Sequence, residues 1–580
     1  MLKISGGTVY DPANGVDGEV RDLWVDGGKI VAPPADRGVK PPRVLDAAGL
    51  VVMPGGIDLH CHIAGPKVNT ARKLRADDRA GEANAVRRRV APADGGAVLR
   101  SGTLGSVPST FAAAYKYAAL GYTTAFDAAV SPLGARQAHQ ELADTPCIDK
   151  GFYCLFGNNH YAMRRLADGQ SSTGQAGDGQ SSNGQSSDGR LRSYLAWLLG
   201  RTKAFAPKLV NPGGVEVWKQ GGGHIEGIDD TVPGFDVSPR QIIEGVARAA
   251  NDLGLPHPVH LHCNQLGMPG NWRTTLDSMH ALDGMRAHIA HVQFHSYGGG
   301  GGPGGDNGDE QSLCSRVAPL AEHINANPNL TVDVGQVMFG PTTTMTADSP
   351  LSHYLHRTLG GRWATHDSEL ESGCGVTPIE YKNRSRYHAL QWAVGLEWYL
   401  LVNDPWQVVM STDHPNGGTF LAYPEIIRLL MDRSYRADVL ATCPDTLPAA
   451  TQLADLDREY TLGEIAVITR AGPARILGLA NKGHLGPGAD ADVTLYTPSD
   501  NPAEMFSLPR HVLKAGELII ENGELRSAPT GKTLHVEADY DRAVVDDFAK
   551  WFNANASIRF ANYGVEDWEV GPSEAVIAGG

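Results

Sequence analysis

Residues 53–62 read Met53-Pro-Gly-Gly-Ile-Asp-Leu-His60-Cys-His62, a short apolar run that ends in two histidines one residue apart. The run is typical of a buried strand. Because side chains alternate across a strand, His60 and His62 lie on one side of it, and Leu59 and Cys61 on the other. Two imidazoles on one side of a strand end can share a metal ion. Two structural, hydrogen-bonded histidines explain the motif equally well, so the choice between metal ligands and structural histidines depends on the rest of the sequence.

The composition indicates a large globular protein without a nucleic-acid-binding surface. The 580 residues are 42% hydrophobic and 20% charged, and this length favours one large domain with a smaller one. The formal net charge of -15 argues against an extended contact with nucleic acid. The seven cysteines are widely spread and form no C-x-x-C, so neither a disulfide framework nor an iron–sulfur site is predicted. We see no signal peptide or membrane-spanning stretch, and we expect a cytoplasmic protein without a membrane partner.

Strand-like segments at the two ends of the chain have the same character. Residues 2–10 and 22–31 are short strands, and Asp26-Gly27-Gly28 between apolar residues is a hairpin signal. This is too little sheet to be stable alone. Residues 489–496 and 517–524 supply similar strands, so we predict one sheet that is shared by both ends.

Between the ends, strand-like and helical stretches alternate, and eight such repeats predict an α/β fold of the TIM-like (β/α)8 barrel type. The predicted strands are residues 57–62, 123–127, 152–156, 208–210, 259–262, 289–293, 330–334 and 408–413, and the clearest helices are 109–120, 239–253, 313–324 and 387–402.

Two segments of low complexity interrupt this pattern. Residues 168–190 contain Gly-Gln-Ser-Ser three times, which predicts a disordered surface insertion. Residues 298–308 are rich in glycine, but they lack the Lys-Ser/Thr that a phosphate-binding P-loop needs.

The carboxyl ends of barrel strands carry functional side chains. In this chain those positions hold four imidazoles, one amine and one carboxylate, a set that suits a two-metal hydrolytic site. The candidate residues are His60, His62, Lys208, His262, His291 and Asp413.

Lys208 is the unusual member of this set, because an ammonium group does not bind a cation. A lysine that burial keeps neutral can react with carbon dioxide, and the resulting carbamate can bridge two metals as a carboxylate does. The alternative is a lysine paired with an acid at a strand end, and Lys203 and Lys219 lie near enough in sequence to compete for the role.

Several of the other positions also have competitors. His260 alternates with His262, which we prefer because it lies nearer the strand end. His288 and His295 flank His291, which directly follows the apolar run; we interpret both as structural or substrate-side histidines.

Asp413 begins the segment Asp413-His-Pro-Asn-Gly-Gly and could simply cap that turn. In a metal site it would accept a proton from the attacking water and pass it to the leaving nitrogen.

These motifs resemble the amidohydrolase superfamily. Residues 54–62 are similar to its first-strand signature, and residues 482–493 to the signature of its C-terminal sandwich. The resemblance implies a β-sandwich from residues 1–52 and 466–530, a metal-dependent barrel over 53–465 and a C-terminal extension over 531–580. It also implies two divalent ions, with zinc expected, a carboxylated Lys208 and Asp413 as catalytic acid and base.

A narrower resemblance links the chain to the A-subunit family of formylmethanofuran dehydrogenase and of the bacterial formyltransferase/hydrolase complex. It rests on residues 208–214, 260–271, 291–298, 411–418 and the tail 548–565, while the insertion at 168–190 departs from the family pattern. The resemblance implies hydrolysis of N-formylmethanofuran to formate and methanofuran, or the reverse condensation, in methanofuran- and tetrahydromethanopterin-linked one-carbon metabolism. It also implies a hetero-oligomer with a formyltransferase subunit. The candidates for substrate contact are Asn211, Asn264, Gln265 and His295.

Two alternatives remain open. One is a cyclic-amide hydrolase related to hydantoinase or dihydropyrimidinase, although the motifs at residues 211–214 and 293–298 argue against it. The other is a scaffold subunit that keeps the fold without catalysis. The sequence leaves open the metal, the state of Lys208 and the physiological direction.

Overall fold

The structure is a computed structural model that describes most of the chain. It leaves out residues 37–40, 80–84, 91–97, 104, 172–186, 222, 300–312, 347, 349–352, 354–355, 358–359, 367–373 and 580.

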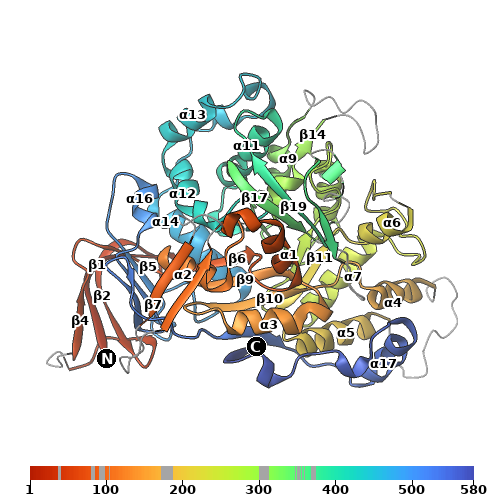
Figure 1. Ribbon diagram of the computed structural model, residues 1–580, viewed down its shortest axis with the longest axis horizontal. Coiled ribbons are helices and arrows are strands. Elements are labelled where there is room, and N and C mark those ends of the chain that lie inside the picture. Colours follow the sequence, from red (N-terminus) through yellow and green to blue (C-terminus); the bar gives the residue numbers. More distant parts are fainter. Residues whose placement is uncertain are drawn as a thin grey trace.

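Eight parallel strands form a curled central wall (Figure 1), which confirms the predicted barrel type of fold. They pair in chain order, and every pair is parallel. The end of the first strand meets the segment that follows the last strand through a bridge between Cys61 and His414, where the His62 N–H donates to the His414 carbonyl at 2.7 Å. These strands are β6 Gly56–Cys61, β9 Tyr122–Val130, β10 Asp149–Leu155, β11 Ala206–Val210, β12 Val259–His262, β13 Ala287–Ile289, β16 Leu330–Asp333 and β20 Val408–Val409.

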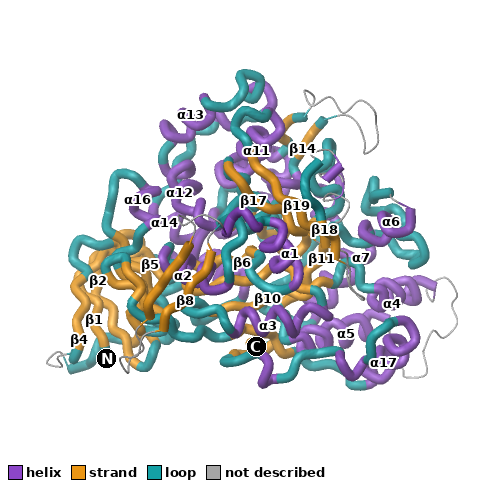
Figure 2. The backbone as a smooth tube through the Cα atoms, in the orientation of Figure 1, coloured by secondary structure: helices purple, strands orange, loops and turns teal. Residues whose placement is uncertain are grey.

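Helices surround these strands (Figure 2), so the strands are buried on both faces. Their sequences mix apolar residues with buried polar and charged ones. The helix α7 Pro239–Asp252 shows how the sequence specifies its elements. Its N-terminus carries a capping box between Ser238 and Gln241 with Pro239 in the first turn, and its apolar side is buried. The other helices are α1 Pro66–Leu74, α2 Thr110–Ala119, α3 Ala135–Ala143, α4 His160–Ser171, α5 Ser187–Thr202, α6 Gly214–Gly221, α8 Trp272–His280, α9 Val317–Ala326, α11 Arg386–Leu401, α12 Tyr423–Met431, α13 Arg433–Ala441, α14 Leu462–Ala466, α15 Gly472–Leu477, α16 Pro502–Ser507 and α17 Ala543–Asn555.

Both chain ends build one mixed sheet beside the barrel, as predicted, and Figure 1 shows the N-terminal strands at its outer side. The two halves join where Val493 pairs with Pro54. The sheet contains β1 Leu2–Asp11, β2 Val16–Asp26, β3 Lys29–Val31, β4 Arg43–Asp46, β5 Val51–Pro54, β21 Val493–Tyr496, β22 His511–Lys514, β23 Glu517–Glu521 and β24 Glu524–Leu525. Two later strands, β25 Thr533–Glu537 and β26 Ser573–Ile577, instead extend the barrel sheet next to β10. The domain limits at residues 52, 465 and 530 stay predictions.

A three-stranded antiparallel sheet leaves the barrel between its seventh and eighth strands, and we call it the excursion. It consists of β17 Gly340–Thr346, β18 Ala364–His366 and β19 Cys374–Tyr381. The excursion lies at the carboxyl end of the barrel, because the Met345 N–H donates to the Asn416 side chain at 2.6 Å and the Tyr381 hydroxyl donates to the Asn416 carbonyl at 3.0 Å. Two further pairs, β7 Ala85–Val90 with β8 Val98–Thr103 and β14 Tyr297–Gly298 with β15 Cys314–Ser315, are also antiparallel.

The predicted boundaries that were wrong include the ends of the sixth and eighth barrel strands and the start of one helix. The sixth barrel strand ends at Ile289, because His291 has a left-handed backbone (φ 33°) and Val292–His295 form a 3-10 turn. The eighth stops pairing at Val409. The helix predicted for 313–324 begins at Val317, since Cys314–Ser315 form a short strand.

The low-complexity predictions are tested only in part. Residues 168–171 and 187–190 continue α4 and α5, so the predicted insertion is too wide at both ends. Residues 172–186 and the glycine-rich residues 300–308 lie outside the described part of the chain. Within the described part, no helix combines the length and apolarity that crossing a membrane requires.

A buried cluster of charges joins the barrel to the terminal sheet. The Lys482 ammonium lies 2.6 Å from Asp149 and 3.0 Å from both Asp490 and Asp492, while Lys514 lies 2.6 Å from Asp149. Burial lowers the pKa of Lys482, but the three carboxylates outweigh it and hold that pKa well above its usual value. Lys482 is therefore charged in the folded protein and compensates acids that belong to two different sheets.

Replacing Lys482 by Met is expected to destabilise the fold by about 3–5 kcal/mol, because it leaves Lys514 as the remaining buried ammonium group against both Asp149 and Asp492. The matched control is Lys29→Met. Lys29 also contacts Asp490, at 2.6 Å, but its side chain is 41% exposed, and such pairs contribute at most about 1 kcal/mol. Urea unfolding midpoints measure both changes. Equal shifts for the two variants would show that the buried cluster does not stabilise the junction.

Candidate metal centre

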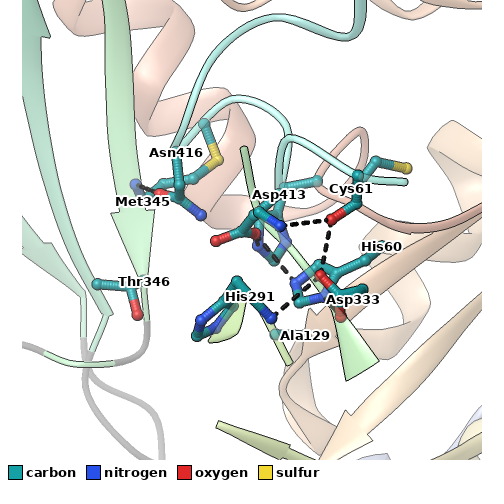
Figure 3. Close-up of polar contacts among 12 residues, drawn as sticks. His60, Cys61, Ala129, His291, Asp333, Met345, Thr346, Asp413 and Asn416 are labelled. Atoms are coloured by element: carbon teal, nitrogen blue, oxygen red, sulfur yellow. Dashed lines mark hydrogen bonds and ion pairs between the residues drawn. The ribbon is translucent and has the colours of Figure 1, made fainter. Parts of the chain in front are cut away.

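Two histidines and one aspartate converge at the carboxyl end of the barrel, and Figure 3 shows one of these histidines, His60, beside Asp413. The Nε2 atoms of His60 and His62 each lie 3.0 Å from Asp413 Oδ1, and all three side chains are at most 5% exposed. His60 Nε2 and Asp413 Oδ1 make no hydrogen bond to any described residue in spite of this distance. Ligand atoms about 2.1 Å from a tetrahedral zinc ion lie about 3.4 Å apart. The spacing and the unsatisfied atoms therefore fit side chains that face a common ion.

A second group of three histidines adjoins the first. His262, His291 and His295 offer ligand atoms within 4.8 Å of one another, and His291 also groups in this way with His60 and Asp413. Within the described residues, His291 Nδ1 and both ring nitrogens of His295 have no hydrogen-bond partner, although these side chains are buried. Because His291 belongs to both donor groups, the two groups adjoin, and their spacing fits two neighbouring metal ions.

Lys208 fits the same centre because its amine is buried and unsatisfied. The side chain is 1% exposed, and Nζ has no hydrogen-bond partner among the residues that the structure describes. Burial lowers the pKa of Lys208 to about 7. A large fraction of this amine is therefore neutral near neutral pH, which is the form that reacts with carbon dioxide.

The protonation states of three candidate histidines and of Asp413 suit metal binding, whereas His60 has a raised pKa. Burial lowers the pKa of His262, His291 and His295 well below its usual value, so these imidazoles are neutral. Burial also lowers the pKa of His60, but the Asp333 carboxylate outweighs it and the net shift is upward. Burial raises the pKa of Asp413, yet the neighbouring histidines outweigh it and keep this carboxyl ionised.

Two carboxylates behind the histidines fix their orientation. Asp333 Oδ2 accepts from His60 Nδ1 at 2.8 Å and from His288 Nε2 at 3.1 Å, while Oδ1 accepts from the His291 N–H at 3.0 Å. Asp127 lies 3.4 Å from His62 Nδ1. These contacts hold Nδ1 of His60 and of His62 and leave Nε2 of both rings to face the centre. Sequence reasoning missed both acids, although each lies at or beside a strand end where it searched for ligands.

Left-handed backbone conformations concentrate at this end of the barrel. His291 has φ 33° and Asp413 has φ 49°, values that non-glycine residues rarely adopt. A side chain on Gly335 would place its Cβ 2.4 Å from His291 Cβ, so glycine is needed for this approach. Asn211 and Gln265 have φ 41° and 62° and also follow barrel strands. Non-glycine residues with such strained backbone conformations cluster at active and ligand-binding sites.

Two of the competing histidines, His260 and His288, lie behind the centre, whereas His295 belongs to the second donor group. His260 Nε2 is 3.1 Å from His60 Nδ1, and His260 Nδ1 is 3.0 Å from His257 Nε2. His288 contacts Asp333 and Thr331. These rings already have polar partners, so they form a layer behind the centre.

The residues predicted to contact substrate separate into two groups. Asn264 Nδ2 donates to Asn211 Oδ1 at 2.7 Å, and Asn264 Oδ1 is buried without a hydrogen-bond partner in the described chain. The Gln265 amide instead donates to the carbonyls of Ile225 and Glu226 at 2.9 and 2.8 Å, so the structure does not bring it to the centre. The roles of all these residues stay predictions.

Replacing Asp333 by Asn is expected to weaken metal affinity by about 10–100-fold, because the amide nitrogen cannot accept the hydrogen bonds that orient His60 and His288. Competition with a chromogenic chelator measures the affinity. The control is Asp457→Asn, at an acid that is 75% exposed in its pair with Arg433. Unchanged affinity in the Asp333 variant would show that this carboxylate does not support the centre.

Comparisons with known proteins identify the family of this chain. A family model described as Amidohydrolase family matches residues 43–520. Protein FwdA of Methanocaldococcus jannaschii is 40% identical over 97% of this chain and 96% of its own length. The A-subunit of the formyltransferase/hydrolase complex Fhc of Methylorubrum extorquens is 37% identical over 93% of this chain and 92% of its own.

A solved structure extends the likeness to the whole fold. The crystal structure of the formyltransferase/hydrolase complex (FhcABCD) from Methylorubrum extorquens in complex with methylofuran contains a chain that matches with a TM-score of 0.87 and 34% identity, over 100% of both chains. These relatives confirm the broad and the narrow resemblance seen in the sequence motifs. With a family match over most of its length, the chain belongs to the amidohydrolase family.

Proposed function

We propose that this chain is the hydrolase component of a formyltransferase/hydrolase complex. It cleaves the C–N bond of N-formylmethanofuran or a close variant to give formate and the free amine, and the same site can run the condensation in reverse. The observation that carries the proposal is the convergence of His60 and His62 on Asp413 at 3.0 Å, with polar atoms left unsatisfied. The similarity to the Fhc relative, which extends over nearly the full length of both chains, supports this choice of substrate.

The donor set fits two divalent ions. The residues that would hold them are His60, His62, Lys208 as its carbamate, His262, His291 and Asp413. Zinc is the expected metal, because imidazole nitrogen and carboxylate oxygen are its usual ligands. When bound, such ions polarise the formyl oxygen and favour deprotonation of water near neutral pH.

Asp413 moves the proton in this scheme. Its carboxylate is ionised in the folded protein, so it can accept the proton that the attacking water gives up. The protonated Asp413 carboxyl then donates that proton to the departing nitrogen as the C–N bond breaks. One water is consumed, and formate and the amine are released.

Asn211 and Asn264 orient the substrate amide in this proposal. Asn264 directs Nδ2 to Asn211, which leaves its buried Oδ1 as an acceptor for the formamide N–H. His295 lies next to His262 and His291, and both of its ring nitrogens lack a hydrogen-bond partner in the described part of the chain, so it lines the same wall.

The test uses the purified complex and measures formate released from N-formylmethanofuran. Hydantoin and dihydrouracil serve as comparison substrates, because related folds act on cyclic amides. We expect formate release from the linear formamide and little turnover of the rings. Turnover of either ring with no reaction of the formamide would contradict the proposed substrate. No turnover of any of them would favour a scaffold role.

The proposal also includes partners. The Methylorubrum relative is part of an assembly of several chains that contains methylofuran. We expect this chain to assemble likewise with a formyltransferase subunit, which would exchange the formyl group with a second one-carbon carrier. Co-purification of the untagged partner proteins with a tagged chain tests the assembly.

A further inference from the structure

Asp348 brings a carboxylate from the excursion to the candidate metal centre. It follows β17 by two residues, and its side chain is buried. Its Oδ2 lies 3.4 Å from His262 Nε2, and its Oδ1 accepts from Asn211 Nδ2 at 3.3 Å. Figure 3 shows Met345 and Thr346 at the end of the same strand, beside Asn416 of the barrel. One carboxylate from outside the barrel thus contacts a candidate ligand and a candidate substrate residue.

His262 contacts its carboxylate through a different ring nitrogen from His60 and His62. His60 and His62 direct Nδ1 toward a buried barrel carboxylate and turn Nε2 toward the centre. His262 directs Nε2 toward Asp348 instead. Since a metal-binding histidine donates one ring N–H to an acceptor and ligates through the other nitrogen, this contact leaves Nδ1 of His262 for the metal.

We propose that Asp348 is a positioning residue that accepts the Nε2–H of His262 and the amide hydrogen of Asn211, and so fixes which nitrogen of His262 faces the metal. The inference rests on the proposed function, because it takes His262 as a ligand. It adds a residue that the barrel strands do not supply.

The second contact of Asp348 extends this effect to the substrate wall. With its Nδ2 held by Asp348, Asn211 presents Oδ1 to Asn264 Nδ2, and Asn264 Oδ1 remains buried and unsatisfied among the described residues. The orientation of both amides therefore depends on one carboxylate. Because Asp348 belongs to the excursion, placement of the excursion and assembly of the centre are coupled.

The experiment compares Asp348→Ala and Asp348→Asn in the purified complex. The control is Glu380→Gln, which changes an exposed acid of the same excursion that is paired with Lys382 at the surface. Zinc affinity is measured by chelator competition, ligand geometry by the visible spectrum of the cobalt-substituted protein, and catalysis by kcat and KM for the formamide.

We expect Asp348→Ala to weaken zinc binding by about 10–100-fold and to change the cobalt spectrum. Asp348→Asn keeps an acceptor oxygen, so its affinity should lie between alanine and wild type. Both variants should lower kcat, and Glu380→Gln should match wild type in every readout.

The proposed function and this inference can fail separately. Wild-type zinc affinity and an unchanged cobalt spectrum in a folded Asp348→Ala variant would overturn the role of Asp348 alone. If the alanine variant does not fold, an Asp348→Asn variant indistinguishable from wild type overturns it. A wild-type complex that binds no metal would overturn the proposed function, and this inference with it.

Discussion

Replacing Asp413 by Asn is expected to lower kcat by about 10³–10⁴-fold, near the upper end of what a general acid–base group contributes. The carboxylate lies 3.0 Å from both His60 and His62 and is ionised in the folded protein. In the proposed mechanism it serves twice in each turnover, first as proton acceptor and then as donor. An amide of the same shape keeps an oxygen near the metal but cannot carry the proton.

The loss of kcat should therefore exceed the loss of metal. Single-turnover formate release and metal analysis of the same sample separate the two effects. Asp438→Asn, at an exposed aspartate on α13, is the control and should leave both unchanged. An Asp413→Asn complex that retains more than about a tenth of wild-type kcat would exclude Asp413 as the proton carrier.

Replacing Lys208 by Met is expected to abolish tight binding of two ions and to lower kcat by about a thousandfold, because metal Lewis acidity is worth several kcal/mol and about 1.4 kcal/mol corresponds to each tenfold change. Met matches the length and apolar character of the lysine stem, so it fills the buried space. The buried Nζ has no hydrogen-bond partner among the described residues, so its removal leaves few polar groups unpaired.

The pH dependence distinguishes a carbamate from a simple amine. Burial lowers the pKa of Lys208 to about 7, so the charged form predominates below that pH and the neutral form above it. Only the neutral amine reacts with carbon dioxide. Metal uptake by depleted protein in bicarbonate should therefore increase from about pH 6 to about pH 8, and the Met variant should show no such bicarbonate effect. Uptake that is independent of bicarbonate would contradict the carbamate.

The barrel and most of its candidate ligands could be predicted because their signals are local. An apolar strand that ends in His or Asp is visible in the sequence, and parallel strands bring such ends to one edge. Asp127 and Asp333 carry the same signal, and a search for supporting acids as well as ligands would have found them.

Other features depend on contacts between segments that are distant in sequence. His291 leaves its strand because its backbone turns left-handed beside Gly335, and nothing in residues 286–295 alone indicates that turn. Asp348 contacts His262 because the excursion places it there. The sequence of the excursion strands contains no motif with the spacing of metal ligands. Gln265 follows a barrel strand as the pattern requires, yet its amide turns to the Ile225 carbonyl.

The metal content of the purified wild-type complex is the most direct test of a two-metal centre. Elemental analysis after extensive dialysis should find two divalent ions per copy of this chain, and the Lys208→Met complex should bind markedly less. Fewer than one tightly bound ion per wild-type chain would contradict the two-metal centre and favour a scaffold subunit that keeps the barrel fold without catalysis.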